Sequence, residues 1–288
     1  MRSRQLTFAF ADSPQGGKDA DPPDASAGKA FLLHRAKCKP TSDLSAPASG
    51  PNDRLLEQAA SEANLATALL NVARNQGAPG VDGRSVDEVV GAARSLLPRL
   101  RHALLNGDYR PGDIRRVWIP KPGGGQRGLG IPNVIDRWVQ QAVLQVLEPI
   151  FEPTFHDSSH GFRPSRGAHT AIAQAKGYVR EGYEVVVDLD LSKFFDRVHH
   201  QRLVSRLAER VVDPRILKLI HQMLQAKVVM PDGTRVSTEQ GTPQGGPLAP
   251  PTILQTSVDS WIECSLEPAF GRGMARAGKR RNALLVQG

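Results

Sequence analysis

The stretch Val185-Val-Val-Asp-Leu-Asp-Leu-Ser-Lys-Phe-Phe-Asp196 gives the strongest structural signal in the sequence. Its apolar start predicts a strand over residues 184–191. Because side chains alternate along a strand, Asp188 and Asp190 are expected to share one face. Two neighbouring carboxylates repel each other unless a cation lies between them, and Mg²⁺ prefers such oxygen ligands. A half-exposed strand with two solvated acids explains the same residues, so both interpretations stay open here.

Around this strand the sequence predicts a mixed α+β architecture. Apolar residues at three- and four-residue steps indicate helices, and a short apolar run before a glycine-rich segment indicates a hairpin. The order of helix, hairpin, helices, strand and helices lacks the regular alternation of a doubly wound sheet. The expected helices cover residues 52 or 53 to 75, 86–105 with an interruption near Pro98, 136–146, 168–179, 202–208 and 214–225, and a strand covers 117–119.

The hairpin carries positive charge at its tip, in the segment Pro120-Lys-Pro-Gly-Gly-Gly-Gln-Arg-Gly128. Glycines let backbone amides approach an anion, and Lys121 and Arg127 flank them as two cations suited to a triphosphate. A solvated basic loop is the other explanation of this segment.

A second glycine-rich segment, Gly241-Thr-Pro-Gln-Gly-Gly-Pro247, differs from a generic turn. Its glycines and prolines leave little side-chain bulk and a restricted backbone, which allows close approach by a base pair. The amide of Gln244 both donates and accepts hydrogen bonds. An ordinary loop remains the alternative.

Composition narrows the class of protein. Among 288 residues, 37 Lys and Arg outnumber 29 Asp and Glu, which gives a formal charge of +8. This excess indicates a nucleic-acid partner or a merely basic surface. The two cysteines, Cys38 and Cys264, exclude a disulfide framework and a cysteine-rich zinc site. No apolar run reaches the roughly 20 residues of a membrane span, so we expect no membrane partner and a cytoplasmic protein.

Taken in order, these segments resemble the reverse transcriptases encoded by bacterial group II introns. The resemblance extends over about residues 54–248. Besides the hairpin, the acidic strand and the glycine-rich turn, it includes Gly77-Ala-Pro-Gly-Val-Asp-Gly83, Tyr109-Arg-Pro111, Asp136-Arg137 and His160-Gly-Phe-Arg-Pro-Ser-Arg-Gly-Ala-His169.

The resemblance implies a right-hand polymerase, with fingers built on the basic hairpin and a palm built on the acidic strand. It implies RNA template (intron RNA), DNA primer and deoxynucleoside triphosphates as partners. The domains expected on this basis are a flexible leader at 1–51, a helical N-terminal extension at 52–109, fingers at 110–180, a partial palm at 181–250 and a divergent basic tail at 251–288.

The resemblance also implies a metal-dependent reaction, nucleotidyl transfer with two Mg²⁺ ions. By its spacing to Phe194, Phe195 and Asp196, Asp190 would be the catalytic carboxylate and a metal ligand, with the Leu191 carbonyl as a second contact to the metal. Asp188 is the less favoured alternative.

The same resemblance assigns residues to the nucleotide. Lys121 and Arg127 would hold the incoming triphosphate. Phe194 would pack against its sugar and exclude a 2′-hydroxyl. Gln244 and Gly245 would support the template and the nascent base pair.

The sequence departs from the family after Pro250. The family's palm ordinarily has a Tyr-Ala-Asp-Asp turn after the Gln-Gly-Gly segment, but no Asp-Asp dipeptide occurs in this sequence. Asp259 and Glu263 do not have palm spacing, so a frameshift near Pro250 or a truncated copy is expected. We therefore expect a defective RNA-directed DNA polymerase. A non-catalytic intron RNA-binding remnant, similar to a maturase, and a chain that does not fold stably are the alternatives.

Overall fold

A computed structural model describes residues 53–121, 124–183, 195–237, 240–242 and 245–248, and the backbone alone of residues 3–8, 185–191, 194 and 282–286. Of the predicted leader, residues 1–2 and 9–51 lie outside these ranges and residues 3–8 form a strand; of the predicted tail, residues 251–281 and 287–288 lie outside them and residues 282–286 form a strand. The described elements are β1 (Ser3–Phe8), α1 (Leu55–Ala59), α2 (Glu62–Asn75), α3 (Val86–Gly91), α4 (Ala93–Asn106), β2 (Ile114–Pro120), β3 (Gln126–Ile131), α5 (Val134–Phe151), η1 (Glu152–Thr154), α6 (Ala168–Arg180), β4 (Val185–Leu191), η2 (Phe194–Asp196), α7 (His200–Ala208), α8 (Pro214–Leu224), β5 (Val228–Val229), β6 (Arg235–Val236) and β7 (Asn282–Val286).

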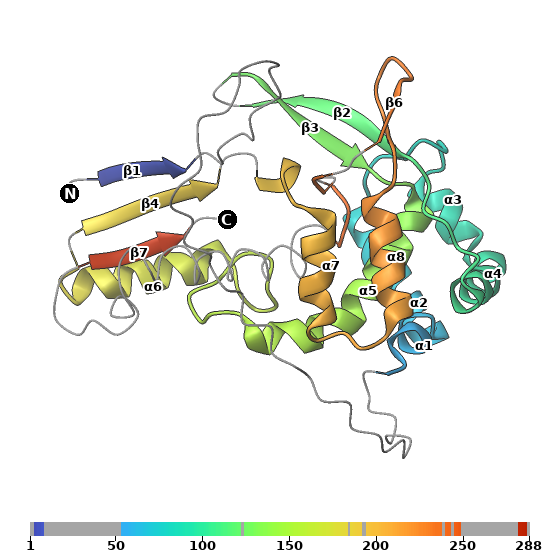
Figure 1. The fold of residues 1–288 in the computed structure, drawn as a ribbon, viewed down its shortest axis with the longest axis horizontal. Coiled ribbons are helices and arrows are strands. Elements are labelled where there is room, and N and C mark those ends of the chain that lie inside the picture. Colours follow the sequence, from blue (N-terminus) through green and yellow to red (C-terminus); the bar gives the residue numbers. More distant parts are fainter. Residues whose placement is uncertain are drawn as a thin grey trace, which may run out of the picture.

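This order confirms the mixed α+β class (Figure 1). The strands form two sheets. One has the order β3-β2-β5-β6, with β2 antiparallel to β3 and parallel to β5. The other has the order β1-β4-β7, and β4 pairs in parallel with both neighbours. The acidic segment is thus the middle strand of its sheet.

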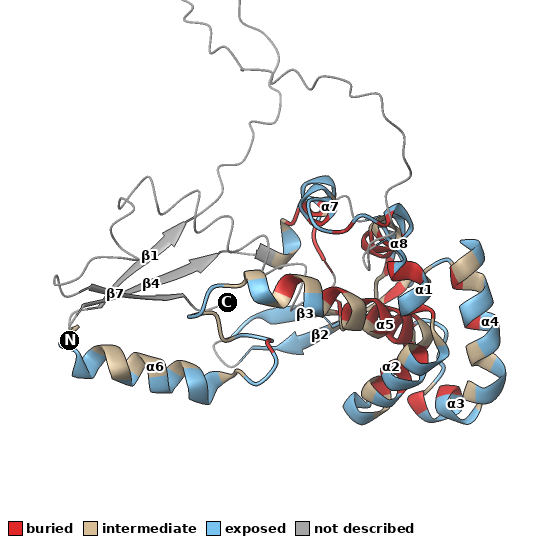
Figure 2. Ribbon diagram, turned by 90° about the horizontal axis from the view of Figure 1, so that it is seen from below, coloured by how far each residue is buried: buried red, intermediate tan, exposed pale blue. Residues whose placement is uncertain are grey.

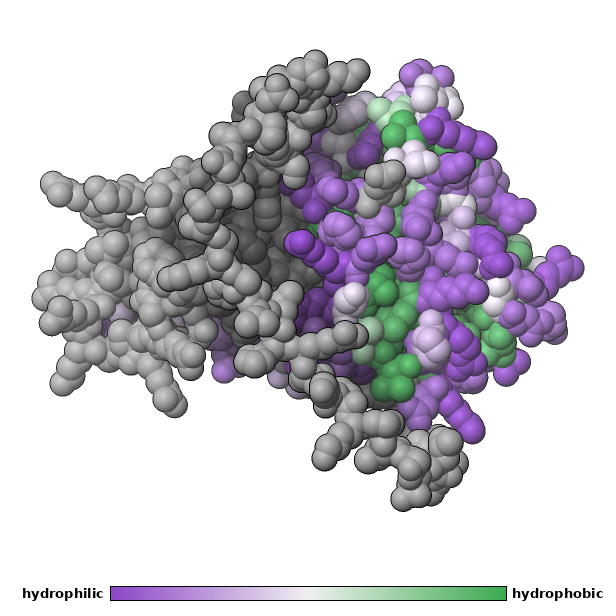
Figure 3. Space-filling view, viewed as in Figure 1, coloured by the Kyte–Doolittle hydropathy of each residue, from purple (hydrophilic) through white to green (hydrophobic). Residues whose placement is uncertain are grey.

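The helix α5 is the centre of the hydrophobic core. Trp138, Leu147 and Phe151 of this helix are fully buried, and Figure 2 shows buried residues along much of its length. The indole N–H of Trp138 donates to the carbonyl of Leu65 in α2, at 2.7 Å. Buried residues of α1 to α4, α7 and α8 belong to the same core. None of the helices in the described ranges is both long and apolar enough to cross a membrane. On the face seen in Figure 3, hydrophilic residues cover most of the described surface.

The single helix predicted over residues 52 or 53 to 75 is two helices in the structure. The first, α1, ends at Ala59, and Ser61 then adopts an extended conformation and accepts the N–H of Asn64 as the N-cap of α2. A serine hydroxyl competes with helical hydrogen bonds, which explains a break that the apolar pattern does not reveal. The Asn64 amide donates to Ala59 and to Ala142, so it fastens the break to α5.

The interruption predicted near Pro98 is also wrong, because the chain breaks at Ala92 and Pro98 lies inside α4. A proline inside a helix removes one hydrogen bond and crowds the carbonyl four residues earlier, yet α4 continues through Pro98 to Asn106. A capping box fixes the start of α3, where Ser85 accepts from Glu88 and the Glu88 carboxylate accepts from Ser85.

The carboxylate of Asp213 connects the start of α8 to α1. It caps α8 by accepting the N–H of Arg215 at 3.0 Å, and it accepts the N–H of Leu56 at 3.0 Å. The Arg215 guanidinium binds Asp213 at 2.9 Å and Glu57 of α1 at 2.7 Å. Burial alone would raise the pKa of Asp213, but the hydrogen bonds from Arg215 and Leu56 outweigh it and lower that pKa below its usual value.

Replacing Asp213 with alanine should lower the free energy of unfolding by about 2–3 kcal/mol, because a buried N–H and a helix cap lose their acceptor. Since the folded-state pKa is lowered, this contribution is complete above about pH 4 and disappears as the pH falls through the folded-state pKa. Urea denaturation of both proteins at pH 7 and at acid pH measures the difference. The control, Glu209→Ala, removes an exposed pair with Arg206 and should change stability by less than about 0.5 kcal/mol. Equal effects of the two substitutions would contradict this account.

Candidate functional site

The first half of the glycine-rich turn is attached to the segment that follows the acidic strand. The N–H of Gly241 donates to the carbonyl of Val198 at 2.8 Å, and the N–H of Thr242 donates to that of Phe195 at 2.7 Å. The ring of His200 lies 2.7 Å from the Gly241 carbonyl. Gly241 has a φ of +90°, and a Cβ there would lie 3.0 Å from the carbonyl oxygen of Phe195. The turn therefore packs by its backbone against η2.

The second half of the turn contacts the basic hairpin and α5. A Cβ on Gly245, whose φ is +144°, would lie 2.5 Å from the carbonyl oxygen of Gly130 in β3. A Cβ on Gly246 would lie 2.3 Å from Oε1 of Gln140 in α5. Backbone meets backbone at Gly245, so a side chain there has no room. The turn thus bridges the hairpin and the segment after the acidic strand.

At the hairpin tip, the structure brings Lys121 and Arg127 to one face. The N–H of Lys121 donates to the carbonyl of Gly125 at 3.1 Å and so extends the pairing of β2 with β3. Arg127 of β3 pairs with Ile119 of β2, and Lys121 follows Ile119 by two residues. Because side chains alternate, the two cations share a face, and both are exposed. Their role in holding a triphosphate stays a prediction.

The remaining predicted site residues lie in β4, η2 and the turn. Asp190 and Leu191 are the last two residues of β4, and Phe194 is the first of η2. Asp188 and Asp190 are two positions apart in the strand, as the predicted shared face requires. Gln244 lies outside the described residues, whereas Gly245 is described and exposed.

The strand supplies the oxygen donors that suit Mg²⁺, namely two carboxylates in alternate positions and nearby backbone carbonyls. Among the side chains that the structure describes, no three His, Cys, Asp or Glu residues gather as a metal site, and those of β4 are not in that set. The donor chemistry of the strand therefore fits the metal, and its ligands stay a prediction.

Comparison with known proteins decides the family. The family model described as "Reverse transcriptase (RNA-dependent DNA polymerase)" matches residues 119–267, which is more than half of the chain. The chain belongs to the reverse transcriptase family. The matched range includes the tip and the second strand of the hairpin, the acidic strand and the glycine-rich turn. It also passes Pro250, and the domain boundary expected there stays a prediction.

Similar proteins include several that group II introns encode. Group II intron-encoded protein LtrA of Lactococcus lactis subsp. cremoris is 36% identical over 186 residues, which are 64% of this chain and 30% of LtrA. Protein YkfC of Escherichia coli (strain K12) is 39% identical over 190 residues, 64% of this chain and 50% of YkfC. Nuclear intron maturase 1 of Arabidopsis thaliana is 37% identical over 94 residues, 33% of this chain and 13% of that protein. The chain thus spans half or less of the length of these relatives.

Two further motifs of this reverse transcriptase form a buried polar cluster that sequence reasoning did not assign. The Tyr109 hydroxyl donates to the Asp136 carboxylate at 2.5 Å, and Asn133 and the N–H of Gly112 donate to it at 3.0 and 3.1 Å. Burial raises the pKa of Asp136 above its usual value, although these hydrogen bonds oppose the shift. Burial and the neighbouring carboxylate raise the pKa of Tyr109 well above its usual value. The cluster ties the entry of the hairpin to the start of α5.

The neighbouring Arg137 holds the loop Gly77–Gly83. Its guanidinium donates to the carbonyls of Gln76 and Ala78 at 3.2 and 2.8 Å. Gly77 has a φ of +95°, which disfavours a side chain, and a Cβ there would lie 2.6 Å from the guanidinium, so both features favour glycine. The sequence analysis identified both the Gly77–Gly83 motif and the Asp136-Arg137 motif. It could not predict their contact, because the two motifs are about 60 residues apart.

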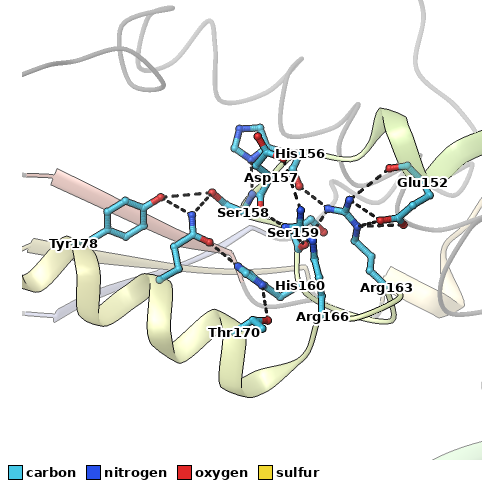
Figure 4. A network of polar contacts seen from close by, with 11 residues as sticks. Glu152, His156, Asp157, Ser158, Ser159, His160, Arg163, Arg166, Thr170 and Tyr178 are labelled. Carbon is cyan, nitrogen blue, oxygen red and sulfur yellow. Dashed lines mark hydrogen bonds and ion pairs between the residues drawn. The ribbon is translucent and has the colours of Figure 1, made fainter.

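The motif His160–His169 forms the network in Figure 4. Arg163 is buried, forms an ion pair with Glu152 at 2.8 Å, and donates to the carbonyls of His156 and Ser159 at 2.7 and 3.0 Å. Phe162 beside it is 64% exposed. Arg163 thereby fixes the loop between η1 and α6 through backbone atoms.

The same network reaches α6 through His160. Its ring nitrogens lie 2.9 Å from the Thr170 hydroxyl and 2.5 Å from the Gln174 carbonyl oxygen. The Gln174 amide donates to Ser158 and Tyr178. These contacts anchor the first two turns of the helix that precedes the acidic strand (Figure 4).

Replacing Gly245 with alanine should lower the free energy of unfolding by about 1–3 kcal/mol, because the new methyl group would press on the Gly130 carbonyl and its φ disfavours a side chain. The matched control is Gly161→Ala, where a Cβ has nothing within 4 Å and φ is not positive. Urea denaturation of the two variants measures the difference. A Gly245 variant as stable as the control would show that the turn does not pack on β3.

Proposed function

We propose that this chain is the RNA-directed DNA polymerase domain of a group II intron protein, with fingers at 110–180 and a partial palm at 181–250, and that this copy is defective in the chemical step because its sequence contains no Asp-Asp dipeptide. Its substrates are an RNA template, a DNA primer and deoxynucleoside triphosphates. The observation that carries the proposal is the glycine-rich turn, whose backbone contacts Phe195 after the acidic strand and Gly130 in the basic hairpin. A nucleotide bound between these parts would meet cations from the hairpin and carboxylates from the strand.

Lys121 and Arg127 hold the triphosphate in this proposal. They share one face of an exposed hairpin, and charge-assisted hydrogen bonds to phosphate are among the stronger ones in proteins. Phe194 packs against the sugar and selects a deoxynucleotide. Gln244 and Gly245 support the template and the nascent pair, and what favours this role is the lack of side-chain bulk beside β3.

Asp190 is the catalytic carboxylate and would hold Mg²⁺ together with the Leu191 carbonyl. When bound, Mg²⁺ activates the primer 3′-oxygen and stabilises the leaving pyrophosphate. The contribution of the chain is to fix the carboxylate at the end of the middle strand of a sheet and to follow it with the turn at η2. Both features favour a rigid site.

A non-catalytic, maturase-like function that binds intron RNA is the second candidate. The sequence has a net charge of +8 but contains no Asp-Asp dipeptide, so the acids that the family adds to Asp190 are missing from it. RNA binding depends on charge and persists without those acids. Two experiments separate the nucleotide site from the chemical step.

Replacing Lys121 or Arg127 with alanine should weaken deoxynucleotide binding about tenfold or more, because each substitution removes a charge-assisted contact. Titration calorimetry with a deoxynucleoside triphosphate and a template–primer duplex measures the affinity. Arg101→Ala, an exposed cation in α4, is the matched control and should leave the affinity unchanged. Unchanged affinity in both hairpin variants would refute the assignment.

Primer extension on an RNA template tests the chemical step. A polypeptide with this sequence should incorporate little or no deoxynucleotide but should bind RNA with an affinity that falls as salt rises. Both a defective polymerase and the RNA-binding candidate predict this outcome, and the deoxynucleotide titration separates the two, because only the polymerase keeps a nucleotide site. Robust extension that Asp190→Ala abolishes would instead show an active polymerase, and the lack of any RNA binding would refute both candidates.

A further inference from the structure

The basic hairpin carries a paired tryptophan and arginine on the face opposite Lys121 and Arg127. Trp118 and Arg116 are two residues apart in β2, so their side chains share a face, whereas Ile119 lies on the other face with Arg127. The Arg116 guanidinium carbon lies 5.7 Å from the centre of the indole ring. Trp118 is nevertheless 44% exposed, so the indole is available to a ligand.

The neighbouring strand is built to leave this pair uncovered. Gly128 stands opposite Trp118 and Gly130 stands opposite Arg116. A Cβ on Gly128 would lie 2.8 Å from a terminal nitrogen of Arg116 and 3.0 Å from the indole of Trp118. Both side chains therefore extend across a strand that has no side chain at this point. The result is a surface on which the guanidinium and a partly exposed ring lie together.

The chemistry of this surface favours a nucleobase. Aromatic side chains stack with bases of any sequence, and a nearby arginine adds cation–π attraction and a positive charge for phosphate. The Nε of Arg116 is buried and lacks a hydrogen-bond partner among the described residues, and the guanidinium lies over the indole ring. A base in a duplex has its faces covered by its neighbours, so stacking on Trp118 requires an unpaired base.

We propose that Trp118 and Arg116 form a stacking platform for single-stranded RNA. The indole of Trp118 stacks on an unpaired base, and Arg116 supports the ring and meets a backbone phosphate. The platform lies on the face of the hairpin away from the pair assigned to the triphosphate, so the two sites bind different ligands. This inference rests on the proposal that the domain binds RNA.

The test compares variants of the whole chain in binding to a fluorescein-labelled single-stranded RNA. Trp118→Ala should weaken binding about fivefold or more, and Trp118→Phe should restore most of the affinity. Ile119→Ala, which removes an apolar side chain that is 41% exposed on the opposite face, should have no effect. Because stacking releases no counterions, Trp118→Ala should leave the salt dependence unchanged, whereas Arg116→Ala should reduce its slope.

A second variant leaves the side chains of Trp118 and Arg116 in the protein and changes only the strand beneath them. Gly128→Ala should push Arg116 off the ring and also weaken RNA binding. In the parent protein, bound RNA should quench tryptophan emission, and most of this quenching should be lost in Trp118→Phe. Circular dichroism shows which variants are folded. If Trp118→Ala does not fold, Trp118→Phe and Gly128→Ala still test the platform.

Three results would overturn the platform. They are folded Trp118 variants with the affinity of Ile119→Ala, an equal loss of affinity for fully paired RNA, and unchanged quenching in Trp118→Phe. If the parent protein binds no RNA at all, the proposed function itself fails. If the parent protein binds RNA and the Trp118 variants bind it as tightly as Ile119→Ala does, the proposed function stands but the platform does not.

Discussion

The site depends on a contact between two stretches of backbone that leaves no room for a side chain. At Gly245 the glycine-rich turn approaches the Gly130 carbonyl of β3 more closely than a Cβ would allow, and at Gly241 it approaches the carbonyls after the acidic strand. Packing between backbones is stiff, since it has no rotamers to adjust. The basic hairpin, the turn and η2 therefore hold a defined relation, which a site for nucleotidyl transfer requires.

Buried polar groups also fix the position of the hairpin relative to α5. Asp136 gathers donors from Tyr109, Gly112 and Asn133 where the chain enters the hairpin. The carboxylate is buried and its pKa is raised, so burial of its charge opposes folding while its three hydrogen bonds favour it. Motifs that mark the family in the sequence thus have two kinds of role. Some face the proposed substrate, and others fix the elements that carry it.

Much of the local structure could be predicted from the sequence, because local physics determines it. Helix α8 begins at Pro214 as expected, since proline suits a first helical turn, and the acidic strand is found at Val185–Leu191. The break at Ser61 was missed because the apolar pattern continues across it. The contact of Arg137 with the loop at Gly77 joins distant residues, and the identity of neither partner reveals the other. The side chains of the acidic strand are not described, so their role still rests on spacing and on the family.

The way in which Arg163 holds its loop affects how the sequence can vary. Arg163 binds the carbonyls of His156 and Ser159, which every amino acid possesses, and it requires a carboxylate only at Glu152. Substitutions at the two carbonyl positions therefore leave this part of the network intact. A lysine at position 163 has a single side-chain nitrogen, so it cannot reproduce the contacts that the planar guanidinium makes with three residues. The contacts of Arg163 thus restrict sequence variation at Arg163 and Glu152 but not at the two positions that contribute a carbonyl.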